Sequence, residues 1–379
     1  MKYLKSYKTK EEYVNDVRGG GRTHSLPNVA LIEEDRKRPY YDVVRMSDNK
    51  LKDIWDRIKD KGWNHNTTSG ITTQELSLIT SDEFNSLNEV EPTNMPGAMW
   101  KGLKTFDEFK YFTGVESINA AKKSSSGNRV GGFNSAKELE SITLPSSLKE
   151  IGEFAFNMVG HIGSTYYLDT KLKHVYGGEN VEKIGYAAFQ NCSALTEFNL
   201  SGKLTEIGTQ AFRGCSSLSS VTIPNSVTSI GAEAFDDCSN LENINGSNSF
   251  IGSATTDISR LFFECEKIKE LDLSNCDFSG IRNYSETGYA KSGLDYFVFK
   301  CYSLETLKLG KFNISGFTNE TNYKLFEGDT SLKDIYITSD SPSLSFLESQ
   351  CILSKIASNV TIHFGEELYT YNGSSWVKS

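Results

Sequence analysis

Residues that could carry out catalysis or hold a metal are few and widely spaced in this sequence. No pair of histidines has the HExxH spacing of a zinc-binding helix, and no GxSxG, Walker or GxGxxG motif is present. Asp236 and Asp237 come closest to an acidic cluster, but such a pair in a predicted turn is more typical of exposed side chains. The sequence therefore predicts no catalytic residue, no metal site and no cofactor. The histidines are His24, His65, His161, His174 and His363.

The cysteines follow a long period instead of a metal-ligand spacing. Three of them lie 23 residues apart, at positions 192, 215 and 238, and two more take the equivalent position in later copies. No CxxC pair exists, which argues against a structural zinc site. A chain of this size can also build a large core without disulfides. We predict a column of reduced, buried thiols made by Cys192, Cys215, Cys238, Cys265 and Cys301, with Cys276 and Cys351 outside it.

Apolar residues share the 23-residue step and define one repeating coil. Within a copy, Val221 and Ile223 alternate with Ser220 and Thr222, which is the pattern of a half-buried strand, and Pro224 ends it. A coil this short cannot bury its apolar side alone, so neighbouring copies must stack. The sequence predicts a β-rich α/β solenoid. The repeated positions are Ile184, Ile207 and Ile230; Phe189, Phe212 and Phe235; and Leu195, Leu218 and Leu241.

These residues resemble the BspA-like family of leucine-rich repeats, found in surface proteins of gut and oral bacteria. The family pattern is roughly Ala-Phe-x-x-Cys-x-x-Leu-x-x-Ile-x-Ile-Pro-x-x-Val-x-x-Ile-Gly, and residues 213–235 match it almost throughout. The resemblance extends over about residues 103–364. It implies a right-handed leucine-rich-repeat coil that acts as a scaffold for binding surfaces. The segment around Ala234 and Phe235 is expected to form a short helical or irregular turn.

Changes in pattern divide the chain into four predicted segments. Residues 1–45 form an attachment or hairpin segment, 46–100 a helical N-terminal cap, 101–364 the leucine-rich-repeat solenoid and 365–379 a C-terminal β-hairpin that turns at Asn372–Gly373. A cap is expected because the end coils of a solenoid otherwise expose apolar residues. The prediction of a helical cap rests on the amphipathic stretch 47–61, for which an interaction helix is the alternative. The repeat register between residues 246 and 300 stays open, because Val298 stands where phenylalanine is expected.

The first segment has a motif of its own. It reads Ser25-Leu-Pro-Asn-Val-Ala-Leu-Ile-Glu-Glu-Asp, followed by Arg36-Lys-Arg-Pro-Tyr-Tyr-Asp. This motif resembles the N-termini of predicted virion proteins from phages of gut bacteria, which carry a similar element before a tyrosine-rich strand. The resemblance implies that residues 1–45 attach the protein to a virus particle. An ordinary capping hairpin is the alternative, and the chain would then be a bacterial cell-surface adhesin of the BspA-like type.

Composition narrows the classes of partner. The formal net charge is −9 and the pI is about 5.3, which argues against nucleic acid and anionic membranes, because both attract clustered lysine and arginine. The mean hydropathy of −0.41 argues against membrane insertion. Residues 1–8 lack the apolar stretch of a secretory signal peptide. The expected location is a virion or a cell surface. The expected partners are a protein or glycan on a bacterial or host surface, and other virion proteins through residues 1–45.

Binding residues are expected on two kinds of surface. In each predicted strand, the side chains that alternate with the buried ones point to the concave side of the solenoid. Tyrosines in the longer inserted segments are further candidates, because loops on a rigid scaffold often carry binding residues. Packing of the insertions is the alternative role for these tyrosines. The strand candidates are His174, Tyr176, Glu197, Asn199, Asn243, Asn245, Glu270, Asp272, Lys308 and Tyr336. The insertion candidates are Tyr166, Tyr167, Tyr284, Tyr289 and Tyr296.

These observations favour a non-enzymatic interaction or adhesion protein. A rival interpretation is that the solenoid recruits substrate for a hydrolase. That interpretation needs a catalytic domain, and residues 1–100 are short and contain little reactive chemistry.

Overall fold

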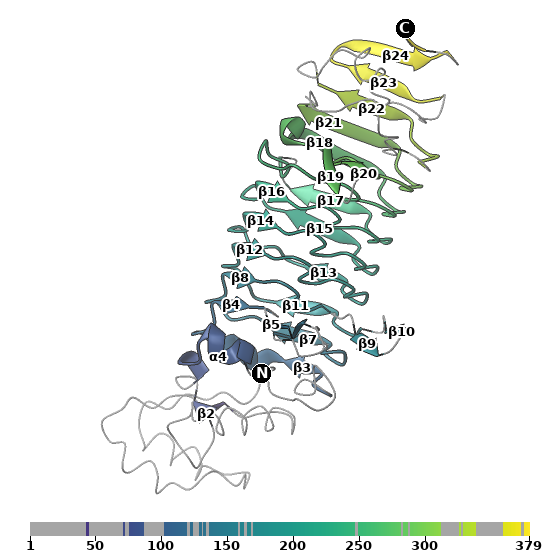
Figure 1. Cartoon of the computed structure of the whole chain (residues 1–379). Helices are drawn as coiled ribbons and strands as arrows, with labels where there is room; N and C mark the ends of the chain where they lie inside the picture. Colours follow the sequence, from purple (N-terminus) through teal and green to yellow (C-terminus); the bar gives the residue numbers. More distant parts are fainter. Residues whose placement is uncertain are drawn as a thin grey trace, which may run out of the picture.

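The chain folds into one long stack of coils (Figure 1). The computed structural model describes residues 43–44, 71–72, 76–86, 102–119, 122–123, 129–130, 132–133, 136–157, 160–162, 165–167, 170–246, 249–281, 283–286, 289–311, 326, 329–338, 359–372 and 375–379. Each coil has three sides that repeat along the stack: a strand of a first parallel ladder, a shorter strand of a second ladder, and a tight turn. The solenoid predicted from the repeat is confirmed.

The first ladder consists of the strands that follow the leucine of each repeat. Strands within a sheet pair in register, so that His174 lies beside Ser141 on one side and Glu197 on the other. Side chains alternate between buried and exposed, because successive residues of a strand point to opposite faces. The strands are β3 (Thr105–Phe106), β7 (Ser141–Thr143), β11 (His174–Tyr176), β13 (Glu197–Phe198), β15 (Ser220–Ile223), β17 (Asn243–Gly246), β18 (Glu270–Asp277), β21 (Thr306–Lys311), β22 (Asp334–Ile337) and β23 (Thr361–Phe364).

The second ladder carries the Ile-Gly step of the repeat. Its strands pair in parallel through the isoleucines, so that Ile184 lies between Ile151 and Ile207. The glycine that follows is required by the close approach of two backbones, since a Cβ on Gly208 would lie 2.7 Å from the carbonyl carbon of Gly185. The strands are β4 (Ser117–Ile118), β8 (Glu150–Ile151), β12 (Lys183–Ile184), β14 (Glu206–Ile207) and β16 (Ser229–Ile230).

The third side of each coil is a turn and not a helix. The backbone N–H of a turn residue donates to a carbonyl of the next coil, as from Ala187 to Thr209 at 2.9 Å. Each turn bends through left-handed residues, such as Glu233 and Asp237, both at φ 58°. These bonds between coils satisfy the backbone polar groups that a helix would pair within one coil.

Phenylalanine rings run along the core. Phe189, Phe212 and Phe235 are buried and stacked face to face, with ring centroids 5.4 and 5.5 Å apart. The planes of successive rings differ by only 2° and 4°. The column exists because one residue type recurs at one position of every coil, so that each ring meets the same ring of its neighbour.

Backbone hydrogen bonds fix the register near residue 300. The N–H of Cys301 donates to the carbonyl of Val298 at 3.3 Å, as the N–H of Cys265 donates to that of Phe262 at 3.2 Å. Val298 therefore takes the phenylalanine position of its coil. The ring of Phe297 fills the space from the neighbouring position, and it stands at 64° to the ring of Phe262. The face-to-face stack ends there.

The predicted column of thiols is present. Each Sγ donates to the carbonyl of the phenylalanine position in the preceding coil, as from Cys215 to Phe189 at 3.3 Å and from Cys265 to Phe235 at 3.1 Å. Burial raises the pKa of the Cys215 thiol well above its ordinary value. The cysteines in the described residues are all buried and free: Cys192, Cys215, Cys238, Cys265, Cys276 and Cys301.

Cys215 is therefore expected to resist alkylation in the folded protein. The thiolate is the reactive form, and burial both disfavours it and blocks access to it. Native protein treated with iodoacetamide at pH 8 should keep Cys215 unmodified, while the same protein in guanidinium chloride should be fully alkylated. Peptide mass spectrometry measures both. Rapid native labelling of Cys215, or a disulfide between two thiols of the column, would contradict this packing.

The helical cap predicted for residues 46–100 is not supported. The stretch 47–61 lies outside the described residues, and the helix that covers the first coil is the six-residue α4 (Ser81–Ser86). Its Ser81 Oγ accepts the N–H groups of Glu116 and Ser117, both at 2.9 Å. A short helix suffices because the edge it covers, strand β4, is only two residues long. Thr80 and Glu83 cap α4 reciprocally, with bonds of 2.9 and 3.3 Å.

An antiparallel hairpin lies at the other end of the stack. β24 (Glu367–Tyr371) pairs with β23, and β25 (Trp376–Lys378) pairs with β24. Tyr371 lies opposite Trp376, so the loop spans residues 372–375 and the predicted two-residue turn at Asn372–Gly373 is wrong. The asparagine explains the wider loop, because its Oδ1 accepts the N–H of Ser375 at 2.9 Å.

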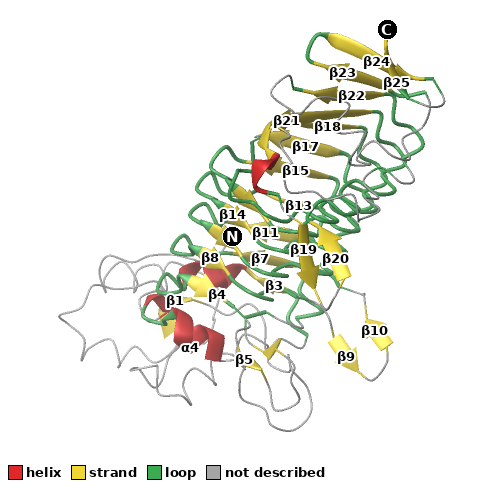
Figure 2. Ribbon diagram, turned by 45° about the horizontal axis from the view of Figure 1, so that its top comes forward, coloured by secondary structure: helices red, strands yellow, loops and turns green. Residues whose placement is uncertain are grey.

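Further hairpins lie beside the stack (Figure 2). β9 (Gly160–Ile162) pairs with β10 (Thr165–Tyr167), and β19 (Asn283–Glu286) pairs with β20 (Tyr289–Ser292). Nearer the N-terminus, β1 (Val43–Val44) pairs with β2 (Ile71–Thr72), and β5 (Lys122–Lys123) pairs with β6 (Arg129–Val130). Two 3-10 helices, η3 (Asp107–Tyr111) and η4 (Phe278–Gly280), complete the described elements. None of the helices in the described ranges has the length and apolar character needed to cross a bilayer.

Candidate binding face

The exposed side chains of the first ladder form two columns, which together we call the sheet face. In-register pairing aligns each column, so that Asp272, Lys308 and Tyr336 lie on successive strands. The strand residues predicted as binding candidates all lie on this face, with Asn199 directly after β13. The first column is Ser141, His174, Glu197, Ser220, Asn243, Glu270, Thr306, Asp334 and Thr361. The second contains Thr143, Tyr176, Thr222, Asn245, Asp272, Lys308, Tyr336 and His363.

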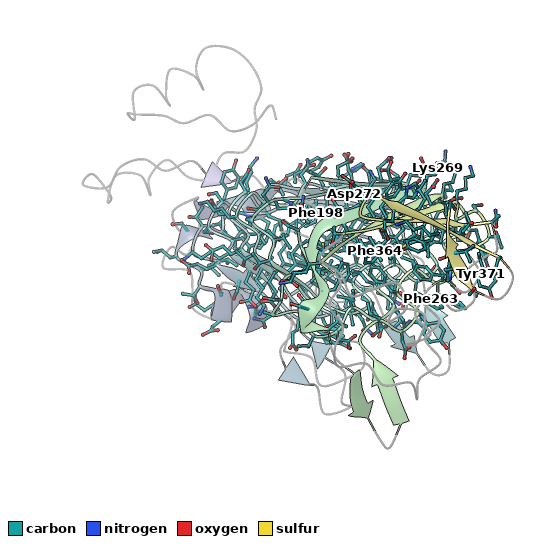
Figure 3. The ribbon with its side chains drawn as sticks, turned by 90° about the horizontal axis from the view of Figure 1, so that it is seen from above. Phe198, Phe263, Lys269, Asp272, Phe364 and Tyr371 are labelled. Atoms are coloured by element: carbon teal, nitrogen blue, oxygen red, sulfur yellow. The ribbon has the colours of Figure 1, made fainter. Side chains whose placement is uncertain are left out.

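Charged and aromatic groups gather at the C-terminal end of the sheet face. The Lys308 ammonium donates to Glu270 Oε1 at 2.6 Å and to Asp272 Oδ2 at 3.3 Å. These bonds, together with their charges, raise the pKa of Lys308. Figure 3 shows Asp272 at one side of the stack and Phe263 at the opposite side. We call Glu270, Asp272, Lys308, Asp334, Tyr336 and His363 the C-terminal cluster.

An aromatic pair is the most rigid part of the C-terminal cluster. The rings of Tyr336 and His363 stack with centroids 4.0 Å apart and planes 14° from parallel. His363 Nε2 lies 2.8 Å from Asp334 Oδ1, which fixes the imidazole from the side. The Tyr336 side chain is still 38% exposed, and its hydroxyl has no hydrogen-bond partner among the described residues. The phenol is therefore held in place and available to a ligand.

A second aromatic pair lies at the N-terminal end of the sheet face. His174 and Tyr176 stack on β11 with centroids 5.8 Å apart and planes 18° from parallel. Tyr176 is 50% exposed. His174 Nδ1 is buried without a hydrogen-bond partner, so no carboxylate holds this imidazole as Asp334 holds His363. Both ends of the sheet face thus carry a stacked histidine and tyrosine, and the pair at the C-terminal end is also held by a carboxylate.

Of the five tyrosines predicted in the insertions, the structure describes the side chain of Tyr296. Tyr166 and Tyr167 lie on β10, and Tyr284 and Tyr289 lie on β19 and β20, whose side chains are outside the described residues. Tyr296 lies in a turn at φ 58° and packs edge-on against Phe299, with centroids 5.0 Å apart. Its role in the described structure is packing, which was the alternative role for these residues.

The turn side carries a chain of polar contacts that the sequence did not reveal. Asp236 is 2% exposed, so the expected exposed turn is wrong at this residue. Its Oδ2 accepts from Arg260 Nε at 2.9 Å and lies 3.5 Å from Arg213 Nε. Burial nevertheless raises the pKa of the Asp236 carboxyl. Arg213 Nη1 also donates to Glu233 Oε2 at 2.7 Å. Because each of these groups has a partner in its own chain, we assign them to joining the coils.

His363 lies on the sheet face although it was not among the predicted binding residues. Alternation along β23 places it in the same column as Tyr336. Extending the strand pattern by one coil would have found it. Within the described residues, no group of three or more histidine, cysteine, aspartate or glutamate side chains is arranged to hold a metal. What the face offers is hydrogen bonding, charge and aromatic stacking.

The sequence was compared with known families and structures. Residues 107–162 and 160–285 match the BspA type leucine-rich repeat region, in six copies. A leucine-rich repeat protein from Bacteroides ovatus is 23% identical over 66% of this chain and 71% of its own, with a TM-score of 0.33. The leucine-rich repeat protein of T. pallidum is 19% identical over 63% and 84%, with a TM-score of 0.30.

A third solved structure is a leucine-rich cell surface protein from Faecalibacterium prausnitzii. It is 17% identical over 66% of this chain and 87% of its own, with a TM-score of 0.26. The comparison with curated proteins gave no match. The predicted repeat family is confirmed for residues 107–285, and the matched residues do not include the N-terminal motif at 25–42.

Proposed function

We propose that this chain, whose repeats are of the BspA leucine-rich type, is a non-enzymatic binding protein that presents its sheet face to a protein partner on a cell surface. One observation carries the proposal. Two columns of exposed side chains run in register along the stack and end in the C-terminal cluster, where Tyr336 is both immobilised and exposed. Rigid aromatic groups of this kind provide contact area with little loss of conformational entropy on binding.

Peptide-library selection tests this proposal. A displayed random peptide library is selected on the immobilised full chain, and enriched peptides are resynthesised for titration. We expect saturable binding that weakens when Tyr336 is replaced by alanine, because that ring belongs to the sheet face. Tyr186→Ala is the matched control, since Tyr186 has a similar exposure of 37% and packs against Phe154 on another side of the coil. Binding should survive that change.

Three results would contradict the proposal that the sheet face is a non-enzymatic site for a protein. Saturable binding only to members of a glycan array would favour the glycan alternative. Turnover of a bound peptide or glycan would favour the interpretation as a recruiting arm of a hydrolase. Loss of binding in both Tyr186→Ala and Tyr336→Ala would show that the ligand does not use the sheet face.

A second candidate function is attachment to a virus particle. The observation that favours it is the motif at residues 25–42, which resembles the N-termini of predicted phage virion proteins. In this proposal residues 1–45 bind the particle and the solenoid contacts the bacterial host. If the chain is instead a bacterial cell-surface adhesin, the same sheet face is displayed on the bacterial surface.

Removal of the N-terminal motif distinguishes attachment to a virus particle from display on a bacterial surface. Removing residues 1–42 keeps β1, which pairs with β2, and removes the motif. If the motif is an attachment segment, the truncated chain should keep its melting temperature and fail to enter assembled particles. Calorimetry and particle sedimentation measure the two effects. A large fall in melting temperature would make the segment part of the fold, and the attachment proposal would lose its support.

A further inference from the structure

We infer that the C-terminal cluster binds an arginine side chain of the protein partner. This inference rests on the proposed function and adds the chemistry of the ligand. A guanidinium is flat, stacks on a tyrosine ring and donates to carboxylates in its own plane. The cluster offers both kinds of contact within one patch. An ammonium would use only the charge, and a neutral sugar would leave the excess charge without a partner.

The free face of Tyr336 is the first feature of the site. One face of its ring is covered by His363 at 4.0 Å, and the other points along the second column toward Lys308 on β21. Lys308 does not occupy that space, because its ammonium is drawn to Glu270 and Asp272 on β18. No cation lies over the Tyr336 ring among the described residues. Tyr336 is 38% exposed, so part of the ring is left for a ligand to stack on.

A carboxylate lies within reach of a group stacked there. Asp334 is two residues before Tyr336 on β22, about 7 Å along the strand, and its side chain is on the same face. Its Oδ1 contacts His363 Nε2, and no contact is present to Oδ2 within the described residues. A guanidinium on the ring could donate to that oxygen. The bond to His363 keeps the carboxylate oriented before the ligand arrives.

The charge of the cluster favours a cation. Glu270, Asp272 and Asp334 contribute three negative charges and Lys308 one positive charge, so the cluster has an excess of two negative charges, leaving His363 aside. Beside the cluster, the opposite charges of Glu305 and Lys333 cancel, because Lys333 Nζ lies 2.6 Å from Glu305 Oε2. Lys269 is exposed beside Glu270, two strands away from Tyr336. The carboxylates are partly exposed, so attraction by the cluster is screened by salt.

Peptide titration provides the test. The probes are three acetylated, amidated octapeptides in which glycine alternates with arginine, lysine or glutamate, titrated against the full chain by fluorescence anisotropy in 50 mM salt. We expect the arginine peptide to bind about threefold to tenfold more tightly than the lysine peptide, because a guanidinium can stack flat on the ring while an N–H of the same group donates to a carboxylate. The glutamate peptide should not bind. Tyr336→Ala should remove the preference for arginine, and Asp334→Asn should weaken binding of both cationic peptides.

Tyr176→Ala is the matched control, because Tyr176 is also an exposed tyrosine stacked on a histidine of the same face. It should leave the titrations unchanged, and thermal melts should show that all variants are folded. Equal affinity for arginine and lysine, or equal losses in Tyr176→Ala and Tyr336→Ala, would overturn the inference. If ligands from the peptide library bind the sheet face without arginine, the proposed function stands and this inference fails. If no ligand binds the face, both fail.

Discussion

Replacing Phe212 with alanine is expected to lower the free energy of unfolding by about 3–5 kcal/mol. The ring is 1% exposed and lies between Phe189 and Phe235, with centroid distances of 5.4 and 5.5 Å. Its removal leaves a cavity between two rings whose backbones are fixed by hydrogen bonds to neighbouring coils. The site therefore cannot collapse to fill the space. Because each coil is stabilised by its neighbours, the loss weakens two interfaces at once.

Denaturation by guanidinium chloride, followed by far-ultraviolet circular dichroism, measures this effect. Ser220→Ala is the control, because Ser220 lies on the sheet face and its replacement should change the free energy of unfolding by about 0.5 kcal/mol or less. Hydrogen exchange should show the loss of protection centred on the coils on either side of residue 212. Equal denaturation midpoints for the two variants would contradict the packing of the phenylalanine column.

The repeat could be predicted because each coil contacts only the coils directly before and after it. A residue such as Phe212 or Cys215 meets its own copy in the next coil, so a spacing in the sequence becomes a contact in the structure. Asp329 follows Phe326 at the spacing by which Cys215 follows Phe212, and the bond from its N–H to the Phe326 carbonyl at 3.2 Å places it at the cysteine position of its coil. The repeat period alone determines which residues these side chains contact.

The ends and turns of the stack could not be predicted in this way. Ser81 contacts Glu116 and Ser117 across more than thirty positions, and no period relates them. The loop at residues 372–375 is closed by bonds between Asn372 and Ser375: the Asn372 N–H donates to the Ser375 carbonyl at 3.0 Å, and Asn372 Oδ1 accepts the Ser375 N–H at 2.9 Å. These bonds compete with the two-residue turn that the Asn-Gly pair favours. Where a contact is made only once, local propensity is the sole guide from the sequence, and a few hydrogen bonds can override it.

The candidate site, too, could be predicted only in part. Alternation in strands correctly placed residues such as Tyr336 and Lys308 on one face. It did not show that Lys308 is drawn away from Tyr336, or that Asp334 holds His363, because these contacts depend on side-chain rotamers. Burial of Asp236 was missed for a different reason. The charged partners that allow it are Arg213 in the preceding coil and Arg260 in the following coil, and the repeat period does not conserve charge.

Asp329 introduces a carboxyl group into the column of buried thiols. It is 5% exposed, and its Oδ1 accepts the N–H of Cys301 at 2.7 Å. Its Oδ2 is buried and has no hydrogen-bond partner among the described residues. Burial raises the pKa of the Asp329 carboxyl to about 8, and the bond from Cys301 only partly opposes this shift. At neutral pH the folded protein therefore keeps a proton on Asp329.

Stability should consequently fall as pH rises from about 4 to about 8. The unfolded chain releases the Asp329 proton near pH 3.9, whereas the folded chain holds it until about pH 8, so between these values folding takes up a proton. The contribution is fully present below the unfolded pKa and lost as pH passes through the folded pKa. Over these roughly four pH units, at about 1.4 kcal/mol per unit, the loss is at most about 6 kcal/mol.

Asp329→Asn tests this assignment, because asparagine keeps an oxygen for the Cys301 N–H and has no titratable proton. Denaturation midpoints measured at pH 5, 6, 7 and 8 should decline more steeply in the native sequence than in the variant. Asp236, whose pKa is also raised by burial, makes a similar contribution to the pH dependence of the midpoint in both proteins. Its effect therefore cancels when the native sequence and the variant are compared. Identical slopes would mean that Asp329 is ionised in the folded protein.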